Sequence, residues 1–252
     1  MSRVVLVTGG VNGIGLATVK KFLSKGDKVV IASLYFGQAT DDTVQELKKE
    51  GEVLFVPCNV AKREDCQNVV KAAKERFGRI DVLANVAGIT GERKSFLDVD
   101  LDDVAKVIDV NLMGTIYMSH AAAQEMAKQK KGVIIHVGSL CGFLANSEAI
   151  GYHASKGAIR MATEAMAKDL SQYGIRVLSV APGWVNTSLM DQKVMDYGGT
   201  MHLKGRIIEP EEIANVIYLM SLDEASAING TTVMADDGYT AFKGVKMRTV
   251  IR

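Results

Sequence analysis

Ser139, Tyr152 and Lys156 carry the side chains of this chain that are best suited to chemistry. Tyr152 and Lys156 are four residues apart in a helical pattern, so they share one helix face. A lysine ammonium beside a phenol favours the phenolate, and we expect it to lower the pKa of Tyr152 towards the range of a general acid or base. The Ser139 hydroxyl can hydrogen-bond the oxygen that gains or loses this proton. Together the three groups could move a proton at an alcohol or carbonyl oxygen.

Spacing alone does not identify this site, because Tyr239 and Lys243 repeat the same interval. On spacing, Ser139 could equally be a turn residue, and Tyr152 and Lys156 surface residues of a helix. The context separates the two sets. An apolar strand pattern ends just before Ser139 and a long helical pattern carries Tyr152 and Lys156, whereas no long helical pattern follows Tyr239.

Apolar β-rich runs alternate with helical patterns along most of the chain. The expected strands are Val4–Thr8, Lys28–Ser33, Val53–Pro57, Ile80–Asn85, Gly132–Gly138, Arg176–Ala181 and Thr231–Ala235. The expected helices span about 14–25, 40–50, 62–77, 101–130, 151–173 and 210–221. This alternation predicts one α/β domain over residues 1–252, a Rossmann-type doubly wound parallel sheet of about seven strands with helices on both faces. Ligands of such sheets bind at the carboxyl ends of the strands.

The turn after the first expected strand, residues 8–15, is rich in glycine. Glycine lets such a turn tighten and lets backbone N–H groups approach a pyrophosphate at a helix N-terminus. The spacing is Gly-x-x-x-Gly-x-Gly, and its place after the first strand favours a dinucleotide site over a plain strand–helix connection. The second strand ends at Ser33 and Leu34, where neither an acid for a ribose hydroxyl nor a base for a 2′-phosphate is present. A small serine does not repel a phosphate, so we lean slightly towards NADP.

Three further features lie where the sheet is expected to bind its ligand. Asn59 and Val60 follow the third strand, beside the expected adenine, and the small residues 85–88 follow the fourth. Ordinary loop sequence remains the alternative for both. Asn111 interrupts the helical pattern of 101–130, and since asparagine disfavours helix interiors, it marks either a kink or a functional amide.

In this order and at these spacings, the motifs closely resemble those of the short-chain dehydrogenase/reductase family, including β-ketoacyl-ACP reductases and hydroxysteroid dehydrogenases. The resemblance covers nearly the whole chain and is carried by residues 8–15, 85–88, Asn111, Ser139, Tyr152, Lys156, 182–187 and 236–238. It implies an NAD(P)-dependent oxidoreductase that interconverts a secondary alcohol and a ketone by hydride transfer.

The resemblance also implies residue roles. Tyr152 would be the acid/base, Lys156 would lower the pKa of the tyrosine and hold the nicotinamide ribose, Ser139 would orient the substrate oxygen, and Asn111 would anchor a water of a proton relay. The implied cofactor-binding residues are Gly9, Asn12, Gly13, Ile14, Gly15, Ser33, Leu34, Asn59, Val60, Asn85, Ala87, Gly88, Tyr152, Lys156, Pro182, Gly183, Val185 and Thr187. No metal is implied. The chain departs from the family at Val86, Asn59 and Asp237, which bears on cofactor affinity and local packing.

The segment 188–208 corresponds to the variable substrate loop of the family and contains Met190, Met195, Met201 and Leu203. Methionine suits irregular apolar ligands, and Leu140, Cys141, Phe143 and Leu144 could line the same cleft. The expected substrate contacts are Ser139, Cys141, Tyr152 and Met190. They favour a bulky apolar substrate such as a hydroxysteroid or bile acid, or alternatively a β-ketoacyl chain. The other possibility is that these residues belong to the core or to an interface. His153 and His202 are expected to be wall or surface residues.

Bulk properties narrow the function further. A net charge of +1 gives no support to a nucleic-acid or membrane-surface role. Three cysteines without metal-ligand spacing favour reduced thiols in the cytoplasm. The resemblance implies a dimer or tetramer formed through the helices at 101–130 and 151–173, and the basic tail at 239–252 could cross such an interface. A non-catalytic nucleotide-sensing or interaction protein is the competing class, which the complete catalytic set disfavours.

Overall fold

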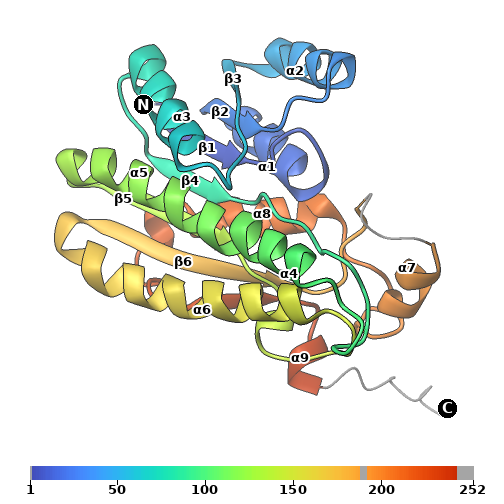
Figure 1. Cartoon of the computed structure of the whole chain (residues 1–252). Coiled ribbons are helices and arrows are strands. Elements are labelled where there is room, and N and C mark those ends of the chain that lie inside the picture. Colours follow the sequence, from blue (N-terminus) through green and yellow to red (C-terminus); the bar gives the residue numbers. More distant parts are fainter. Residues whose placement is uncertain (1, 188–191, 243–252) are drawn as a thin grey trace, which may run out of the picture.

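A computed structural model of the protein describes residues 2–187 and 192–242, with only the backbone described for 192–195. Within these residues, seven parallel strands form one sheet in the order β3-β2-β1-β4-β5-β6-β7 (Figure 1). The strands are β1 Val4–Thr8, β2 Lys28–Ser33, β3 Val53–Pro57, β4 Val82–Asn85, β5 Gly132–Val137, β6 Ile175–Pro182 and β7 Thr232–Ala235. This confirms the predicted Rossmann-type, doubly wound parallel sheet. The prediction of one domain over 1–252 stays a prediction.

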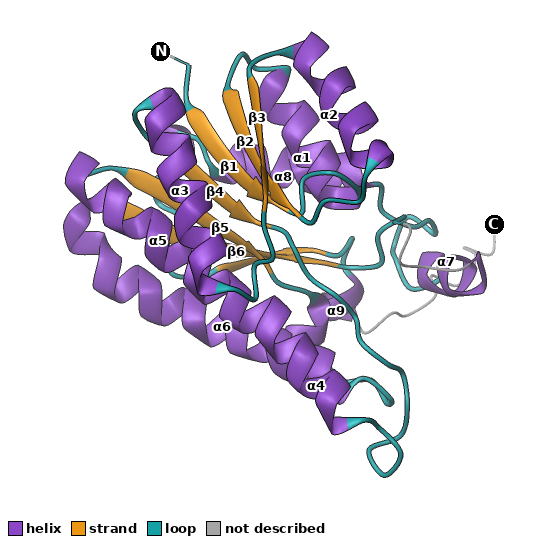
Figure 2. Cartoon of the chain, turned by 45° about the horizontal axis from the view of Figure 1, so that its top comes forward, coloured by secondary structure: helices purple, strands orange, loops and turns teal. Residues whose placement is uncertain are grey.

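The central strands are apolar on both faces because helices cover both faces (Figure 2). Every residue of β1 and of β5 is buried. Side chains of β1 alternate between two cores, with Leu6 in the core beneath α3 and α5, and Val5 and Val7 in the core beneath α1 and α8. The alternation follows from the two-residue period of a strand.

One layer contains helices from the start and the end of the chain, and the other layer contains helices from its middle. They are α1 Gly13–Leu23, α2 Gln38–Glu50 and α8 Pro210–Met220 on one side, and α3 Arg63–Phe77, α5 Gly114–Gln129 and α6 Ile150–Leu170 on the other. Two short helices that the sequence did not predict, α7 Gln192–Gly199 and α9 Tyr239–Phe242, lie near the carboxyl ends of the strands (Figure 1). No helix among residues 2–187 and 192–242 has the length and apolar character needed to span a membrane.

The predicted helix at 101–130 is in fact three segments. The helix α4, Leu101–Ile108, leads into a π-helical turn at Asp109–Met113, and α5 continues from Gly114. Asn111 lies in that turn, which widens the helix by one residue and often marks a functional position. The expected interruption at Asn111 is therefore confirmed.

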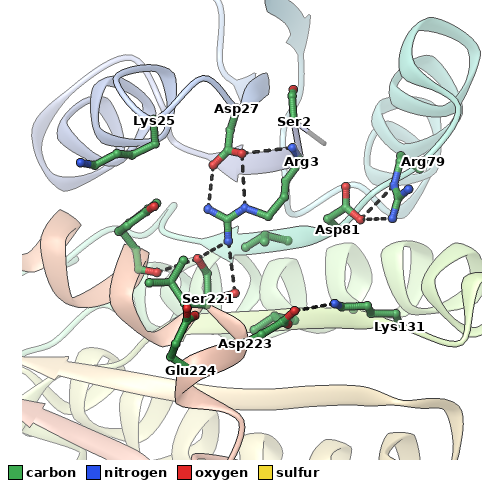
Figure 3. Close-up of a pocket in the computed structure, with 15 residues that line it drawn as sticks. Ser2, Arg3, Lys25, Asp27, Arg79, Asp81, Lys131, Ser221, Asp223 and Glu224 are labelled. Atoms are coloured by element: carbon green, nitrogen blue, oxygen red, sulfur yellow. Dashed lines mark hydrogen bonds and ion pairs between the residues drawn. The ribbon is translucent and has the colours of Figure 1, made fainter.

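The amino ends of the strands form a polar pocket of about 450 Å³ (Figure 3). Figure 3 shows the guanidinium of Arg3 between two partners, the carboxylate of Asp27 at 2.7 Å and the hydroxyl of Ser221 at 3.0 Å. In the same view, Lys131 reaches Asp223 at 2.8 Å. Six of the eight charged residues of this pocket are thus paired with one another, and these pairs join the start of β1 to the segments around β2, β5 and α8.

Candidate active site

A cavity of about 330 Å³ opens at the opposite edge of the sheet, at the carboxyl ends of β4, β5 and β6. Ten of the residues singled out from the sequence line it: Ile14, Gly88, Ser139, Cys141, Tyr152, Lys156, Pro182, Gly183, Val185 and Thr187. They come from five separate stretches of the chain. The parallel sheet brings these stretches to one edge, as expected for a ligand site in this kind of fold.

Ser139 follows β5 in an extended conformation and caps the 3-10 turn Leu140–Gly142. Its side-chain oxygen accepts a hydrogen bond from the backbone N–H of Cys141 at 3.1 Å. This contact satisfies a helix-start donor and fixes the serine rotamer. The hydroxyl therefore faces the cavity next to Tyr152.

Tyr152 and Lys156 lie in the first two turns of α6, on the face that meets the sheet. The Lys156 Nζ atom is 5.6 Å from the centre of the Tyr152 ring and donates to the carbonyl of Val137 at 2.8 Å. Lys156 is only 5% exposed. Burial lowers the pKa of Lys156 to about 8, while the nearby Cys141 opposes this shift.

The expected lowering of the Tyr152 pKa is not what the structure shows. Burial raises the pKa of Tyr152 to about 12, the Cys141 thiol adds to the rise, and the hydrogen bond with Ser139 opposes it. Burial penalises the charged phenolate, and this cost outweighs the stabilisation that Ser139 gives to it. The prediction from helix spacing was therefore wrong for the pKa, although it placed the two side chains correctly.

Asn111 is buried beneath the catalytic helix and its side-chain amide is fully engaged. The amide oxygen accepts from the N–H of Ile89 at 2.8 Å, and the amide nitrogen donates to the carbonyl of Ile89 at 2.9 Å and to the hydroxyl of Ser155 at 3.0 Å. The π-helical turn thus lets Asn111 clamp the segment after β4 to α6. Its predicted role in anchoring a water stays a prediction.

The glycine-rich turn encloses a space that would be occupied by side chains if its glycines were replaced by other residues. A Cβ atom on Gly15 would lie 2.1 Å from the carbonyl oxygen of Gly9, and Gly9 itself has a positive φ of 68°. The hydroxyl of Thr8 accepts from the backbone N–H groups of Val86 and Ala87 at 2.9 and 3.0 Å, which joins this turn to the segment after β4. Because α1 begins at Gly13, its free N–H groups face the same place. The turn therefore fits the pyrophosphate of a dinucleotide.

The other predicted cofactor residues lie outside the cavity lining, along the carboxyl edge of the sheet from β3 to β4. Ser33 is buried at the end of β2, and Leu34 is half exposed. The Asn59 side chain accepts from the N–H of Ala61 at 3.1 Å, which shapes the loop after β3. Val60 is buried against Gly114 of α5. The side chain of Asn85 points into the interior, where its amide donates to Ser119 at 2.9 Å, so only its backbone faces the expected cofactor side.

The substrate side differs from the sequence expectation in several places. Cys141 and Leu140 line the cavity, but Phe143 and Leu144 do not. Phe143 instead lies under the guanidinium of Arg160, 4.6 Å from it. The predicted contact Met190 lies outside the described residues, as does the side chain of Met195. The sequence reasoning gave no site role to nine lining residues: Val86, Ile89, Thr90, Arg93, Val137, Gly138, Asn146, Ala149 and Trp184. Val86 and Trp184 lie inside motifs that carried the family resemblance, whereas Arg93, Asn146 and Ala149 lie farther along the loops after the strands, where no local signal pointed to them.

Of the two histidines expected in the wall or at the surface, His153 is in the wall, whereas His202 is neither, because it is buried away from the cavity lining. His153 lies in the cavity wall, where its Nε2 atom accepts from the N–H of Asn146 at 2.9 Å. His202 is buried, and its Nε2 atom accepts from the N–H of Trp184 at 3.2 Å. Both acceptor nitrogens are therefore occupied.

The second tyrosine–lysine pair does not form a comparable site. Tyr239 begins the four-residue helix α9 and does not line the cavity, while Lys243 lies outside the described residues. Among the described residues, no group of three or more histidine, cysteine or acidic side chains is arranged to hold a metal ion.

Comparison with known proteins assigns the chain to a family. Residues 3–198 match the family model described as short chain dehydrogenase. The chain belongs to the short-chain dehydrogenase family. It is therefore an oxidoreductase of the kind that acts on alcohols and ketones, and the family uses NAD or NADP.

Relatives within the short-chain dehydrogenase family act on different substrates. The chain is 35% identical over 243 residues to a 3-oxoacyl-[acyl-carrier-protein] reductase of Synechocystis, covering 96% of this chain and 98% of the relative. It is 34% identical over 246 residues to a meso-2,3-butanediol dehydrogenase of Serratia marcescens, covering 96% of both chains. The solved structure of ElxO with NADP bound superimposes with a TM-score of 0.90 at 27% identity, over 96% of this chain and 100% of that one.

Proposed function

We propose that this short-chain dehydrogenase interconverts a secondary alcohol and a ketone at the cavity lined by Ser139, Tyr152 and Lys156. The observation that carries the proposal is the convergence of a hydroxyl, a phenol and a buried amine on one cavity next to a glycine cradle. A nicotinamide cofactor, when bound, supplies or accepts the hydride. The protein itself provides position, proton transfer and exclusion of water.

Each catalytic side chain has a part that its environment supports. Tyr152 donates a proton to the carbonyl oxygen during reduction and takes it from the hydroxyl during oxidation. A phenol whose pKa is raised to about 12 remains protonated at neutral pH, which suits the donor role. The Ser139 hydroxyl orients the same substrate oxygen. Lys156 donates a hydrogen bond to the carbonyl of Val137 and binds the ribose of the cofactor. Its positive charge also acts electrostatically on the phenol of Tyr152.

Residues of the glycine turn and of the neighbouring strand ends would hold the dinucleotide, with a preference for NADP. The preference rests on the end of β2, where Ser33 is followed by apolar Leu34, Tyr35 and Phe36. The nearest acid along the chain, Asp41, accepts a hydrogen bond from the Tyr35 hydroxyl at 2.7 Å. Residues 33–36 themselves contain no carboxylate that would repel a 2′-phosphate.

An apolar substrate fits the walls of the cavity. Ile89, Leu140, Trp184 and Ala149 supply apolar surface on the substrate side. A hydroxysteroid or bile acid is the substrate class that we favour. The alternative is a 3-oxoacyl chain carried by an acyl carrier protein, in view of the relative from Synechocystis.

A coupled binding and turnover experiment tests the function. The purified protein is titrated separately with NADPH and NADH while nicotinamide fluorescence is followed, and it is then offered a panel of steroid, bile-acid, 3-oxoacyl and simple ketones. We expect tighter binding of NADPH and oxidation of NADPH by at least one ketone class. Tight nucleotide binding without turnover across the panel would favour the non-catalytic, nucleotide-sensing alternative.

Two further properties complete the proposal. We infer a homodimer or homotetramer formed through α4, α5 and α6, because large apolar side chains such as Leu101 and Met161 are exposed on these helices at 70% and 58%. Light scattering of the purified protein measures the assembly directly. The free thiols of Cys58, Cys66 and Cys141 support a reducing location such as the cytoplasm.

A further inference from the structure

Arg93 is a cation in the wall of the catalytic cavity. It lies in the segment between β4 and α4, and it lines the same cavity as Ser139, Tyr152 and Lys156. The positive charge of Arg93 acts on groups inside the cavity. Although burial raises the pKa of the Cys141 thiol, the hydrogen bond with Ser139 and the charges of Lys156 and Arg93 oppose that rise. Arg93 and Cys141 are therefore close enough to interact.

The guanidinium of Arg93 makes no hydrogen bond or ion pair with any residue that the structure describes. The acids beside it in the chain are already engaged. Glu92 pairs with Lys94 at 2.5 Å, and a carboxylate oxygen of Asp103 accepts from the N–H of Glu92 at 2.6 Å. This distinguishes Arg93 from the arginines of the opposite pocket, where Arg3 is paired with Asp27 and Arg79 with Asp81.

The charges that line the cavity favour a negatively charged ligand. None of its described lining residues is an aspartate or a glutamate, whereas Arg93 and Lys156 are both basic. Lys156 is committed to the carbonyl of Val137 and to the tyrosine. Arg93 is thus the cation that remains for a ligand, and the amide of Asn146 lies in the same wall.

We propose that Arg93 binds a carboxylate of the substrate, so that the preferred ketone or alcohol has an apolar body and a carboxylate group. This inference rests on the proposed function and narrows its substrate class. A planar guanidinium matches the two oxygens of a carboxylate with two parallel hydrogen bonds. The apolar walls then hold the remainder of the molecule, with the reacting carbon near Tyr152.

Alkylation of Cys141 tests the charge of the cavity without any knowledge of the substrate. The Cys141 thiolate attacks the methylene carbon of either iodoacetate or iodoacetamide and displaces iodide. Because the two reagents differ in charge, the ratio of their rate constants reports the local potential. Cys58 and Cys66 are only 3% and 0% exposed, and peptide mass spectrometry separates their modification from that of Cys141. The ratio is measured for the wild type, for Arg93→Gln and for the matched control Lys94→Gln, which removes the neighbouring, paired cation.

We expect Arg93→Gln to lower the iodoacetate-to-iodoacetamide ratio at Cys141 by roughly three- to tenfold, since one unit charge at short range is removed. Lys94→Gln should leave the ratio unchanged. An equal ratio in all three proteins would overturn the proposal. Both variants remove an exposed charge, so circular dichroism is expected to show the same fold for all three proteins.

Matched ketone pairs then test the substrate class. A keto acid such as 4-oxopentanoate and its methyl ester are compared within the turnover panel. We expect Arg93→Gln to raise the KM for the acid roughly tenfold or more, with kcat and the kinetics of the ester little changed. Equal use of acid and ester by the wild type would overturn the carboxylate assignment. A protein that turns over no ketone would instead contradict the proposed function, while the alkylation ratio would still report on Arg93.

Discussion

The two ends of the sheet carry pockets of opposite character. The pocket at the amino ends is the larger, about 450 Å³, and three of its four basic residues, Arg3, Arg79 and Lys131, have an acidic partner. The fourth, Lys25, lies over the ring of Tyr218. The cavity at the carboxyl ends is smaller, about 330 Å³, and holds Lys156 and Arg93 without an acid in its described lining. Volume therefore does not distinguish the functional end, whereas a buried cation without an acid in the same lining does.

The difference has a physical reason. A paired charge is neutralised by its partner and contributes to holding segments together, so it has little left to offer a ligand. An unpaired, buried amine such as Lys156 costs stability, because desolvation is not offset by an opposite charge. Such a cost persists at sites where the group performs chemistry. The two ends thus separate interactions that stabilise the fold from groups that act on a ligand.

The largest expected effect is at the phenol of the carboxyl end. Tyr152→Phe removes the proton donor and keeps the ring, so we expect kcat to fall by roughly 10²- to 10⁴-fold while NADPH still binds. Turnover of the best ketone of the panel and NADPH fluorescence provide the two measurements. The matched control is Tyr173→Phe in the 3-10 turn that follows the same helix, which should retain full activity. Near-normal turnover by Tyr152→Phe would remove the contrast between the two ends.

The second prediction concerns the glycine cradle. Gly15→Ala places a Cβ atom 2.1 Å from the carbonyl oxygen of Gly9, which forces the turn to move. Overpacking of this kind costs about 1–3 kcal/mol, so we expect NADPH affinity to fall by roughly 10- to 100-fold. Gly157→Ala is the control, because a Cβ atom there meets nothing within 4 Å. Unchanged NADPH binding by Gly15→Ala would show that the turn is a plain connection.

The third prediction compares the two ends by stability. Lys156→Met removes an unpaired buried cation and should raise the free energy of unfolding at pH 7 by about 1–3 kcal/mol while abolishing activity. Arg3→Met breaks a partly buried ion pair and should lower that free energy by about 1–3 kcal/mol with activity retained. Urea unfolding measures both. Changes of the same sign in the two variants would contradict the comparison.

The fourth prediction gives the pH dependence of the Lys156 effect. Its folded-state pKa of about 8 is below the ordinary value of 10.5, so the unfolded chain retains the proton when the folded protein has released it. The destabilisation is full below pH 8 and is relieved as the pH rises from 8 towards 10.5. The stability gap between wild type and Lys156→Met should therefore shrink by about 1–2 kcal/mol between pH 7 and pH 9.5. A stability difference between the two proteins that stays constant over this pH range would argue against a lowered pKa of Lys156.

The smallest effect is expected for an exposed pair of the amino end. Lys131 and Asp223 are 63% and 75% exposed, so water and salt screen their interaction. Lys131→Gln should change the free energy of unfolding by less than about 1 kcal/mol and leave turnover unchanged. Thermal unfolding at low and high salt provides the measurement. A loss of activity in this variant would show that the amino-end pocket has a function beyond support of the fold.

Much of the fold was predictable because its signals are local. Strands buried on both faces appear as continuous apolar runs, and β1, β2 and β3 have the predicted bounds. The start of β4 was placed two residues too early, since an apolar run does not show where pairing begins. The helices α7 and α9 were missed because segments of eight and four residues provide little periodicity.

The amino-acid sequence by itself determined the order of strands and helices, the glycine turn, and the types and spacing of Ser139, Tyr152 and Lys156. These features depend on short-range geometry and on residue chemistry. Only the tertiary structure decided which distant segments share the cavity, that Arg93 has no acidic partner among the described residues, and that burial raises the pKa of Tyr152. Burial and charge compensation depend on neighbours that are far apart in the chain, so no local pattern contains them.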